Sequence, residues 1–513
     1  MYRKLLPLAL CLVPTVAHAE WVEATSPHFV VYADDNPEKV RKFATRLEQF
    51  DQSLRKLMGA SPRQANPAAR VTIFYLDSTS DIARLYGSGG RNVGGFYEDR
   101  ASGSVAFVPH SGGEGEQQGF DSQVVLFHEY AHHFMYSNWT GAAFPKWFSE
   151  GFAEFCATAI FRGNDTIVLG APPNYRSWGV GQSMLLPARR LLLPDPGKLA
   201  DDETQVLYAR GWALFDYMLS DTGRAGQLAA YIGAVNAGRP IEEANALLGN
   251  VALLDGKLNA HVKRPTFTSF PVNQKDLSIG EVTLRSLSPG EAATMPARIR
   301  SERGVDEKIA PEVAALARRL AAPYVNDAAA QNELAEAEFD AGNYAASEAA
   351  ADRAIAADPK SIHALLYKGM AQMEAARKDK VTDPVRWQTI RRWFLAANKL
   401  DKEDPQPLIL FYQSFGAAGQ KPTANAESAL VYAYALAPYD MGLRLNAAAV
   451  LLGLGRTQAA RVALEPVAYS PHAETGGAKA AKVLEILDAK GPQAALEALM
   501  AKDEPVQDSR KKS

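Results

Sequence analysis

The chain contains 513 residues, a length that suggests about three domains. Its apolar fraction of 47% is typical of a globular protein, and its formal net charge of -3 gives no indication of nucleic-acid binding. Only two cysteines occur, Cys11 and Cys156. Because Cys11 falls in a leader that we expect to be removed, no intramolecular disulfide is expected.

Residues 1–19 have the pattern of a secretory signal peptide. Arg3 and Lys4 give a charged start, an apolar run follows, and Ala17-His18-Ala19 has the small-x-small pattern of a cleavage site. The run is too short to cross a membrane, and no later stretch is long and apolar enough to do so. We therefore expect an exported protein, in the bacterial periplasm or secreted, whose mature chain has no membrane span.

The hydrophobic pattern of residues 20–261 predicts a mixed α+β domain. Short β-branched and aromatic runs indicate strands, and apolar residues at helical spacing indicate helices. In chain order, we predict strands at 21–24 and 29–33, a helix at 37–58, a strand at 71–76, a helix at 78–86, and strands at 93–97 and 104–108.

Two histidines four residues apart follow in an apolar stretch that predicts a helix. His128-Glu129-Tyr130-Ala131-His132 is an HExxH pattern, and residues four apart share one face of a helix, so both imidazoles can reach one metal ion. Catalytic Zn²⁺ takes three protein ligands and keeps one position open for water. Glu150 is the candidate third ligand. Glu129 is the candidate general base, which would take a proton from that water.

Residues 128–133 (HEYAHH) and 147–155 (WFSEGFAEF) resemble the gluzincin metallopeptidases, and within them the peptidase MA-like domains of bacterial exported proteins. In that group the glutamate of a W-x-x-E-G-x-A motif is the third zinc ligand, and it corresponds to Glu150 here. The resemblance covers roughly residues 20–260. It implies a zincin-like α+β fold, one zinc ion and hydrolysis of peptide bonds.

The chain departs from aminopeptidase-N-type relatives in two ways. The interval between His132 and Glu150 is one residue shorter than is usual in them, and the G-x-M-E-N stretch that grips a free amino terminus is missing. The nearest stretch of sequence upstream of the HExxH motif is Gly94-Gly95-Phe96-Tyr97-Glu98. The resemblance therefore implies a zinc peptidase that is not an aminopeptidase.

Further residues are candidates for supporting this site. Glu154 lies one helical turn after Glu150 and can orient a zinc-bound imidazole; the alternative is an ordinary surface carboxylate. Related peptidases carry an oxyanion-stabilising tyrosine about 60 residues after the glutamate ligand, which corresponds to Tyr208. Tyr217 and Arg210 are alternatives to Tyr208, and both tyrosines are equally compatible with a role in the core. The strand at 104–108 is either a substrate-binding edge strand or an ordinary strand of the sheet.

Residues 262–305 contain several prolines between short apolar pieces and are predicted to be a linker or a small β subdomain. From 306 to 500 the chain is alanine-rich and helical, and residues 332–359 resemble a tetratricopeptide repeat (TPR). Prolines recur at 359, 405, 438 and 471, which fits four repeats from about 311 to 472 stacked into a solenoid. The polar residues 501–513 are predicted to be disordered.

The leading hypothesis is an exported zinc metallopeptidase that acts on a peptide or protein substrate, with a repeat domain that binds protein partners or substrates. The repeat surface either binds such a partner or packs on the peptidase domain. Two other functions stay open. The chain could be a non-catalytic envelope scaffold that works through its repeats, although a structural zinc site has no need of Glu129. It could also be a zinc hydrolase that acts on a non-peptide bond.

Overall fold

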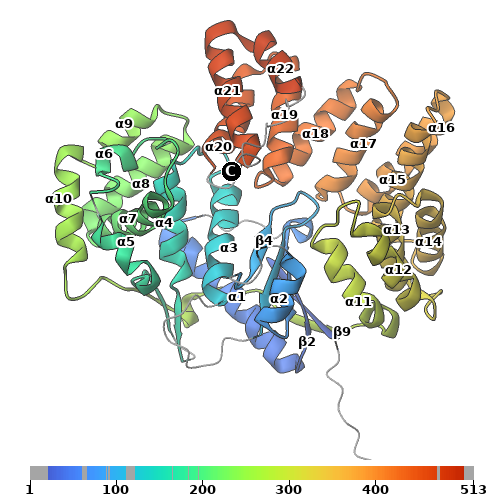
Figure 1. Cartoon of the computed structure of the whole chain (residues 1–513), viewed down its shortest axis with the longest axis horizontal. Coiled ribbons are helices and arrows are strands. Elements are labelled where there is room, and N and C mark those ends of the chain that lie inside the picture. The colour runs from blue at the N-terminus through green and yellow to red at the C-terminus, as the bar shows by residue number, and fades with distance from the viewer. Residues whose placement is uncertain are drawn as a thin grey trace, which may run out of the picture.

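The computed structural model describes residues 21–60, 66–87, 89, 93–110, 122–163, 166–182, 184–194, 196–470 and 474–501. It consists of an N-terminal α/β region followed by a long all-helical region that forms an arc beside it (Figure 1). The predicted signal peptide and residues 502–513 of the predicted tail lie outside the described residues. None of the described helices combines the length and the apolar character needed to cross a bilayer.

A six-stranded mixed sheet forms the centre of the α/β region. Its strand order is β4-β5-β3-β2-β1-β9, in which β2, β3 and β5 run parallel and each remaining strand pairs antiparallel with its neighbour. The strands are β1 (Trp21–Thr25), β2 (Phe29–Asp34), β3 (Val71–Leu76), β4 (Phe96–Glu98), β5 (Val105–Pro109) and β9 (Thr283–Ser286).

Helices cover both faces of this sheet. On one face lie α1 (Pro37–Met58) and α3 (Ser122–Asn138), joined by stacking of Phe50 on Phe127 with ring centroids 3.9 Å apart. On the other face lie α2 (Thr79–Tyr86) and α11 (Pro289–Glu302), which enclose strand residues such as Phe74. Burial on both faces explains why β5 is apolar along its whole length rather than alternating.

The strand predicted at 104–108 is not an edge strand. It corresponds to β5, which pairs with β3 on one side and with β4 on the other. The edge of the sheet nearest to α3 is instead β4. A strand buried on both faces gives the same apolar sequence whether it lies at an edge or inside, so the sequence pattern could not separate the two positions.

Residues 262–305 do not form a subdomain of their own. Their two strands join sheets built by earlier parts of the chain: β9 pairs with β1, and β8 (Phe270–Asn273) pairs with β7 (Thr166–Leu169). The small second sheet has the order β6-β7-β8, where β6 is Ile160–Arg162. The segment ends with α11, which packs against one face of the six-stranded sheet.

A group of helices between residues 146 and 262 packs beside α3 (Figure 1). They are α4 (Lys146–Ala157), α5 (Ser177–Gly181), α6 (Ala188–Leu191), α7 (Asp201–Leu219), α8 (Thr222–Asn236), α9 (Ile241–Ala246) and α10 (Val251–Val262). Helices α4 and α7 are in close contact at Gly151 and Gly211, where a Cβ on Gly151 would lie 2.4 Å from the backbone of Gly211. Glycine is needed there because any larger residue would separate the two helices.

The all-helical region continues as antiparallel helix pairs. After α12 (Ala310–Ala321), the pairs are α13 (Ala328–Asp340) with α14 (Tyr344–Ala357), α15 (Ile362–Lys378) with α16 (Pro384–Leu400), α17 (Pro405–Ala417) with α18 (Ala424–Leu436), α19 (Met441–Gly453) with α20 (Thr457–Tyr469), and α21 (Glu474–Lys490) with α22 (Pro492–Met500). A helical repeat stack is therefore present. Pro359 and Pro438 lie between successive pairs and Pro405 is the first residue of α17, so all three mark pair boundaries as the proline spacing predicted; Pro471 lies outside the described residues. The pairs extend beyond the predicted limits, because α21 and α22 follow residue 472.

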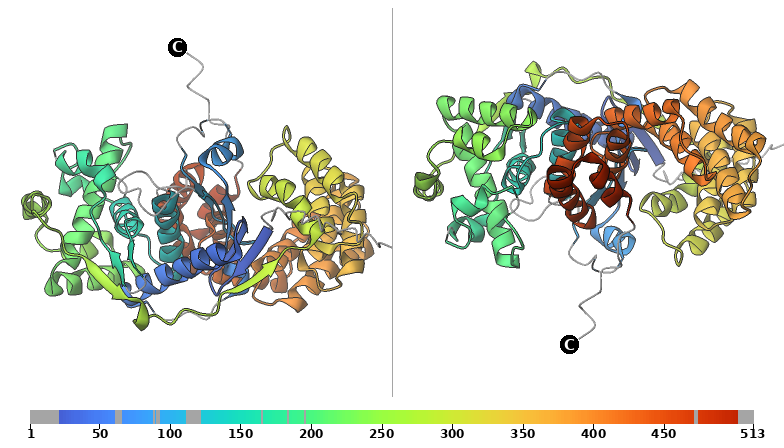
Figure 2. Two further views of the ribbon diagram at one scale, coloured as in Figure 1. Left: turned by 90° about the horizontal axis from the view of Figure 1, so that it is seen from below. Right: turned by 90° about the horizontal axis from the view of Figure 1, so that it is seen from above.

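The repeat stack contacts the α/β region at several points. Figure 2 shows the central sheet and α3 between the green helices α5–α10 and the yellow and orange helices α11–α18. In the turn between β4 and β5 (residues 99–104), Arg100 Nη1 lies 3.6 Å from Glu302 Oε2 of α11. The backbone N–H of Ala101 donates to Asp440 Oδ2, the N-cap of α19, at 2.7 Å. The repeat surface was expected either to bind a partner or to pack on the first domain. Packing on the first domain is observed at the start of α19.

Candidate metal centre

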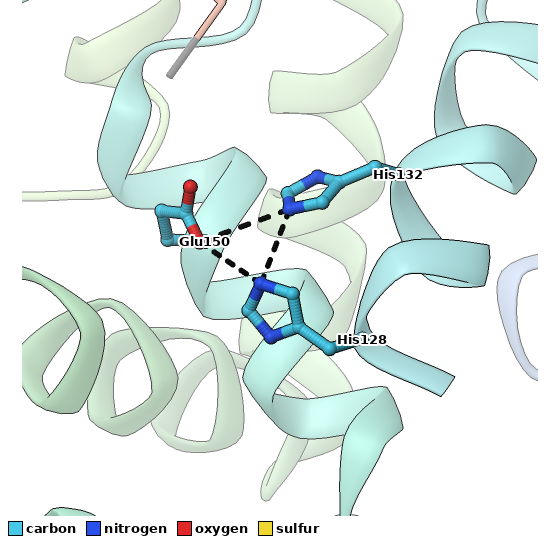
Figure 3. Close-up of side chains that lie close together, drawn as sticks. All are labelled: His128, His132 and Glu150. Atoms are coloured by element: carbon cyan, nitrogen blue, oxygen red, sulfur yellow. Dashed lines mark hydrogen bonds and ion pairs between the residues drawn. The ribbon is translucent and has the colours of Figure 1, made fainter. Parts of the chain in front are cut away.

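The three predicted ligands converge from two neighbouring helices. His128 and His132 project from one face of α3, and Glu150 projects toward them from α4 (Figure 3). His128 Nε2 lies 3.2 Å from Glu150 Oε2, His132 Nε2 lies 3.7 Å from the same oxygen, and the two Nε2 atoms are 3.3 Å apart. One donor atom from each residue thus faces a common point.

The surroundings of Glu150 favour a positive charge beside its carboxylate. Every residue of α4 from Trp147 to Ala157 is buried, and Glu150 itself has no exposed surface. A carboxylate taken out of water costs several kcal/mol unless positive charge compensates it. Burial alone would lower the pKa of His128, but the hydrogen bond and charge of Glu150, with the charges of Glu154 and Glu129, raise it to about 9. The cluster therefore favours a positive charge between its carboxylates.

Glu154 lies behind His128, as the helical spacing predicted. Its Oε1 is 3.6 Å from His128 Nδ1, the ring nitrogen that faces away from Glu150. Glu154 also accepts hydrogen bonds from Tyr175 Oη at 2.8 Å and from the Arg176 guanidinium at 2.8 and 3.1 Å. It is buried and held in place, and so is not a surface carboxylate.

Tyr175 and Arg176 were not anticipated from the sequence. They belong to a short 3₁₀ turn, Asn174–Arg176, that follows Pro172 and Pro173. The Arg176 guanidinium also lies over the ring of Tyr208, 4.6 Å from its centroid. No spacing rule links these residues to the HExxH motif, and only the folded chain brings them together.

Of the three candidate oxyanion stabilisers, Tyr208 lies at the cluster. Its ring centroid is 6.0 Å from that of His128, and burial with the charge of Glu150 raises the pKa of its hydroxyl well above the usual value. Tyr217 instead packs against His261, with ring centroids 5.5 Å apart. Arg210 is buried and binds Asp255 at 2.5 Å. Both alternatives are engaged elsewhere.

Glu129 is half-buried and lies within electrostatic reach of the cluster. Its negative charge contributes to raising the pKa of His128 and of Tyr208. The next histidine along, His133, turns away from the cluster. Its Nδ1 is hydrogen-bonded to Tyr97 Oη of β4 at 2.9 Å, and its ring lies 4.5 Å from that of Tyr439.

A second cluster with possible metal donors lies at the start of β2 and on α1. His28 Nδ1 is 2.9 Å from Glu48 Oε2 and 3.7 Å from Asp51 Oδ2. Arg55 Nε already donates to the same Asp51 oxygen at 2.7 Å, and Tyr130 Oη donates to the other Asp51 oxygen at 2.8 Å. The guanidinium supplies the charge that a cation would bring, so this cluster is an ion-pair network that ties α1 to the histidine helix.

This network predicts a pH dependence of stability. Burial would lower the pKa of His28, but its hydrogen bond to the Glu48 carboxylate and the charges of Asp51 and Glu48 outweigh burial and the charge of Arg55, so the folded-state pKa is raised. The stabilisation is therefore complete below the unfolded pKa of about 6.5 and is lost as pH rises through the folded value. Urea unfolding midpoints should fall more between pH 6 and pH 9 for the wild type than for His28→Gln. Equal falls in both proteins would contradict this assignment.

The fold and the cluster define an α/β region with a candidate His-His-Glu metal centre, joined to a helical repeat stack. No family model matches the chain, and no curated protein matches it. Among solved structures, a thermophilic TPR protein of Thermus thermophilus is similar at 15% identity and a TM-score of 0.32, over 38% of this chain and 99% of that one. The MamA RS-1 ArsTM double mutant is similar at 13% identity and a TM-score of 0.27, over 39% and 98%. Both TM-scores are too low to establish a shared fold.

Proposed function

We propose that this chain is a partner-binding protein built on a helical repeat stack, and that its α/β region carries a zinc-dependent hydrolytic site acting on peptide bonds. The binding role rests on the helix pairs from α13 to α22, which span residues 328–500. Stacked helix pairs present an extended curved surface, which commonly binds proteins. The hydrolytic role rests on one observation, the convergence of His128, His132 and Glu150. Neither of the two similar structures is described as a hydrolase.

The donor set fits zinc. Zinc lies about 2.0–2.1 Å from imidazole nitrogen and about 2.0–2.2 Å from carboxylate oxygen, so two donors at a tetrahedral angle are separated by about 3.4 Å. The separations of 3.2, 3.3 and 3.7 Å match this spacing. Two imidazoles and one carboxylate leave one position open, which is the pattern of a catalytic rather than a structural zinc site. Bound zinc would supply a Lewis acid and an acidified water.

The residues of the chain supply the remaining chemistry. Glu129 accepts the proton of the attacking water as general base. Tyr208 keeps its proton at neutral pH, because its pKa is raised, and its hydroxyl can donate a hydrogen bond to the developing oxyanion. Glu154, held by Tyr175 and Arg176, restrains the ring of His128. The edge strand β4, on the α3 side of the sheet, is the natural partner for an extended peptide.

The Glu129→Gln variant tests the hydrolytic proposal. Zinc content and cleavage of a broad peptide library are measured for the wild type, for Glu129→Gln and for Glu38→Gln, an exposed control on α1. We expect about one zinc per chain in all three, and a loss of cleavage of at least a hundredfold in Glu129→Gln alone, because the ligands persist while the base is removed.

Two other outcomes would decide against this site. If all three proteins hold zinc and none cleaves a peptide, the hydrolytic role is excluded and only the partner-binding role remains. Absence of zinc from the wild type after purification with added zinc would overturn the metal centre itself.

Export to the periplasm or beyond the cell is a further part of the proposal, supported by the pattern of residues 1–19.

A further inference from the structure

One buried arginine joins the repeat stack to the connection between the two ligand helices. Arg444 of α19 has no exposed surface, and its guanidinium donates to neutral oxygens of the described chain. Within the repeats it donates to the carbonyls of Pro438 and Val462, at 2.5 and 3.5 Å, and to the hydroxyl of Tyr434 at 3.2 Å. It also donates, at 2.9 Å, to the carbonyl of Thr140, which lies 304 residues earlier in the chain.

The cost of burying Arg444 points to a positioning role. Burial lowers the pKa of its guanidinium, which nevertheless stays charged at physiological pH. No carboxylate of the described residues contributes to this shift. A buried charge without a counter-charge is costly, and an apolar side chain of similar shape would fill the space without that cost. What only the guanidinium supplies is a rigid fork of donors, which holds the Thr140 carbonyl against those of the repeats.

Thr140 lies in the short connection between α3 and α4, residues 139–145. This connection leads from the helix that carries the two histidine ligands into the helix that carries Glu150 (Figure 3). Its next residue, Gly141, is also enclosed. A Cβ there would lie 3.1 Å from a backbone oxygen at the end of α8 and 3.6 Å from a methyl group of Val462 in α20. The repeat helices α19 and α20 therefore both contact the connection.

The same helix pair holds α3 itself at two further points. The ring of Tyr439, just before α19, lies 4.5 Å from that of His133, the residue after the second histidine ligand. The hydroxyl of Tyr136 in α3 is hydrogen-bonded to the side chain of Ser470, the residue that ends α20. Tyr439 and Leu443 also belong to the same apolar core as α3 and α4. The repeat stack is thus packed continuously with the two ligand helices.

The metal centre is sensitive to the arrangement that these contacts hold. Its three donor atoms come from two helices, so their separations of 3.2, 3.3 and 3.7 Å persist only while α3 and α4 keep their relative position. A zinc site tolerates changes of about 0.2 Å in its ligand distances. A displacement of α4 relative to α3 by about half an ångström would therefore weaken zinc binding.

We propose that Arg444 is a positioning residue for the metal centre, through which the helix pair α19–α20 sets the affinity of the site for zinc. This inference rests on the proposed function, because it requires that His128, His132 and Glu150 bind zinc. The coupling is reciprocal: if docking of the helix pair tightens zinc binding, bound zinc must strengthen the docking of the pair. The repeat stack is then part of the hydrolytic unit as well as a binding surface.

The experiment compares Arg444→Met with Arg391→Met in the full-length protein. Arg391 of α16 is the matched control, because its guanidinium also donates to neutral groups, those of Ser414 and Gln420, but these lie within the repeats. Both substitutions remove one guanidinium and keep an unbranched side chain. Zinc affinity is measured by competition with a chromophoric chelator, and urea unfolding measures the stability of each variant. Ser470→Ala, which removes only the hydrogen bond to Tyr136, is the milder variant if Arg444→Met does not fold.

We expect zinc to bind at least about tenfold more weakly to Arg444→Met than to Arg391→Met, whatever their relative stabilities, and about two- to fivefold more weakly to Ser470→Ala than to the wild type. Hydrogen exchange supplies a second measurement, which a purely structural role of Arg444 would not change. In the wild type, zinc should slow amide exchange in α19 and α20 more than in α15 and α16, which belong to a separate apolar cluster.

The outcomes separate failure of this inference from failure of the metal centre. Equal zinc affinity of Arg444→Met and Arg391→Met would overturn the positioning role alone. So would wild-type zinc affinity in Ser470→Ala together with equal effects of zinc on exchange in the two helix pairs. A wild-type protein that binds no zinc would overturn the proposed metal centre, and this inference with it.

Discussion

Replacing Glu150 by glutamine is expected to lower the affinity for zinc by about a hundred- to a thousandfold. Structural zinc sites bind with about 10–16 kcal/mol over four ligands, so one ligand contributes about 2.5–4 kcal/mol. The amide oxygen of glutamine keeps the volume of the buried side chain but carries no charge, so the loss falls on metal binding rather than on packing. Zinc affinity is measured by competition with a chromophoric chelator, and any peptide cleavage should fall in parallel.

Glu48→Gln is the matched control. Glu48 is also a fully buried glutamate beside a histidine, in the only other group of described residues that could hold a metal ion. Arg55 already balances that network, so Glu48→Gln should leave zinc affinity within about twofold of the wild type. Loss of zinc in Glu48→Gln with retention in Glu150→Gln would reverse the assignment of the two clusters.

Replacing Gly151 by alanine is expected to destabilise the protein by about 3 kcal/mol or more. The new Cβ would lie 2.4 Å from both the carbonyl carbon and the oxygen of Gly211, and backbone atoms cannot move aside as the end of a flexible side chain can. Helices α4 and α7 would have to separate, and Glu150 and Tyr208 would move with them. The midpoint of urea unfolding measures the loss of stability.

Gly226→Ala provides the opposite expectation for the same chemical change. Gly226 is an exposed residue within α8, away from the ends of the helix, and an added Cβ would meet no atom within 4 Å. Alanine there should stabilise the protein by about 0.5–1 kcal/mol, because it reduces the entropy of the unfolded chain. An unfolding midpoint for Gly151→Ala as high as that for Gly226→Ala would show that the two helices are not in close contact.

The local elements were predictable where one periodicity dominates. The helices at 37–58 and around the HExxH motif follow from apolar spacing, and the proximity of His128 to His132 follows from helix geometry alone. The place of Glu150 depended on a resemblance, because spacing along the chain does not determine how two helices pack. The contacts of Glu154 with Tyr175 and Arg176 had no local signal at all.

Long-range pairing accounts for what the sequence pattern missed. Strand β9 pairs with β1, although about 260 residues separate them along the chain. The local sequence of neither strand indicates which strand it pairs with. The prolines around β9 indicated a linker, since proline interrupts local structure whether or not the intervening residues pair elsewhere. The same limit applies to β5, whose position inside the sheet depends on β4.

The turn between β4 and β5 has a mechanical consequence for the whole molecule. Arg100 fastens it to α11 near the beginning of the arc, and Ala101 fastens it to Asp440 at the start of α19, much further along. The six residues 99–104 thus connect α11 with the start of α19 across the arc of helices. The curvature of the repeats cannot relax without breaking these attachments or pulling on β4, so a load applied to the arc is transmitted to the strand beside the histidine helix.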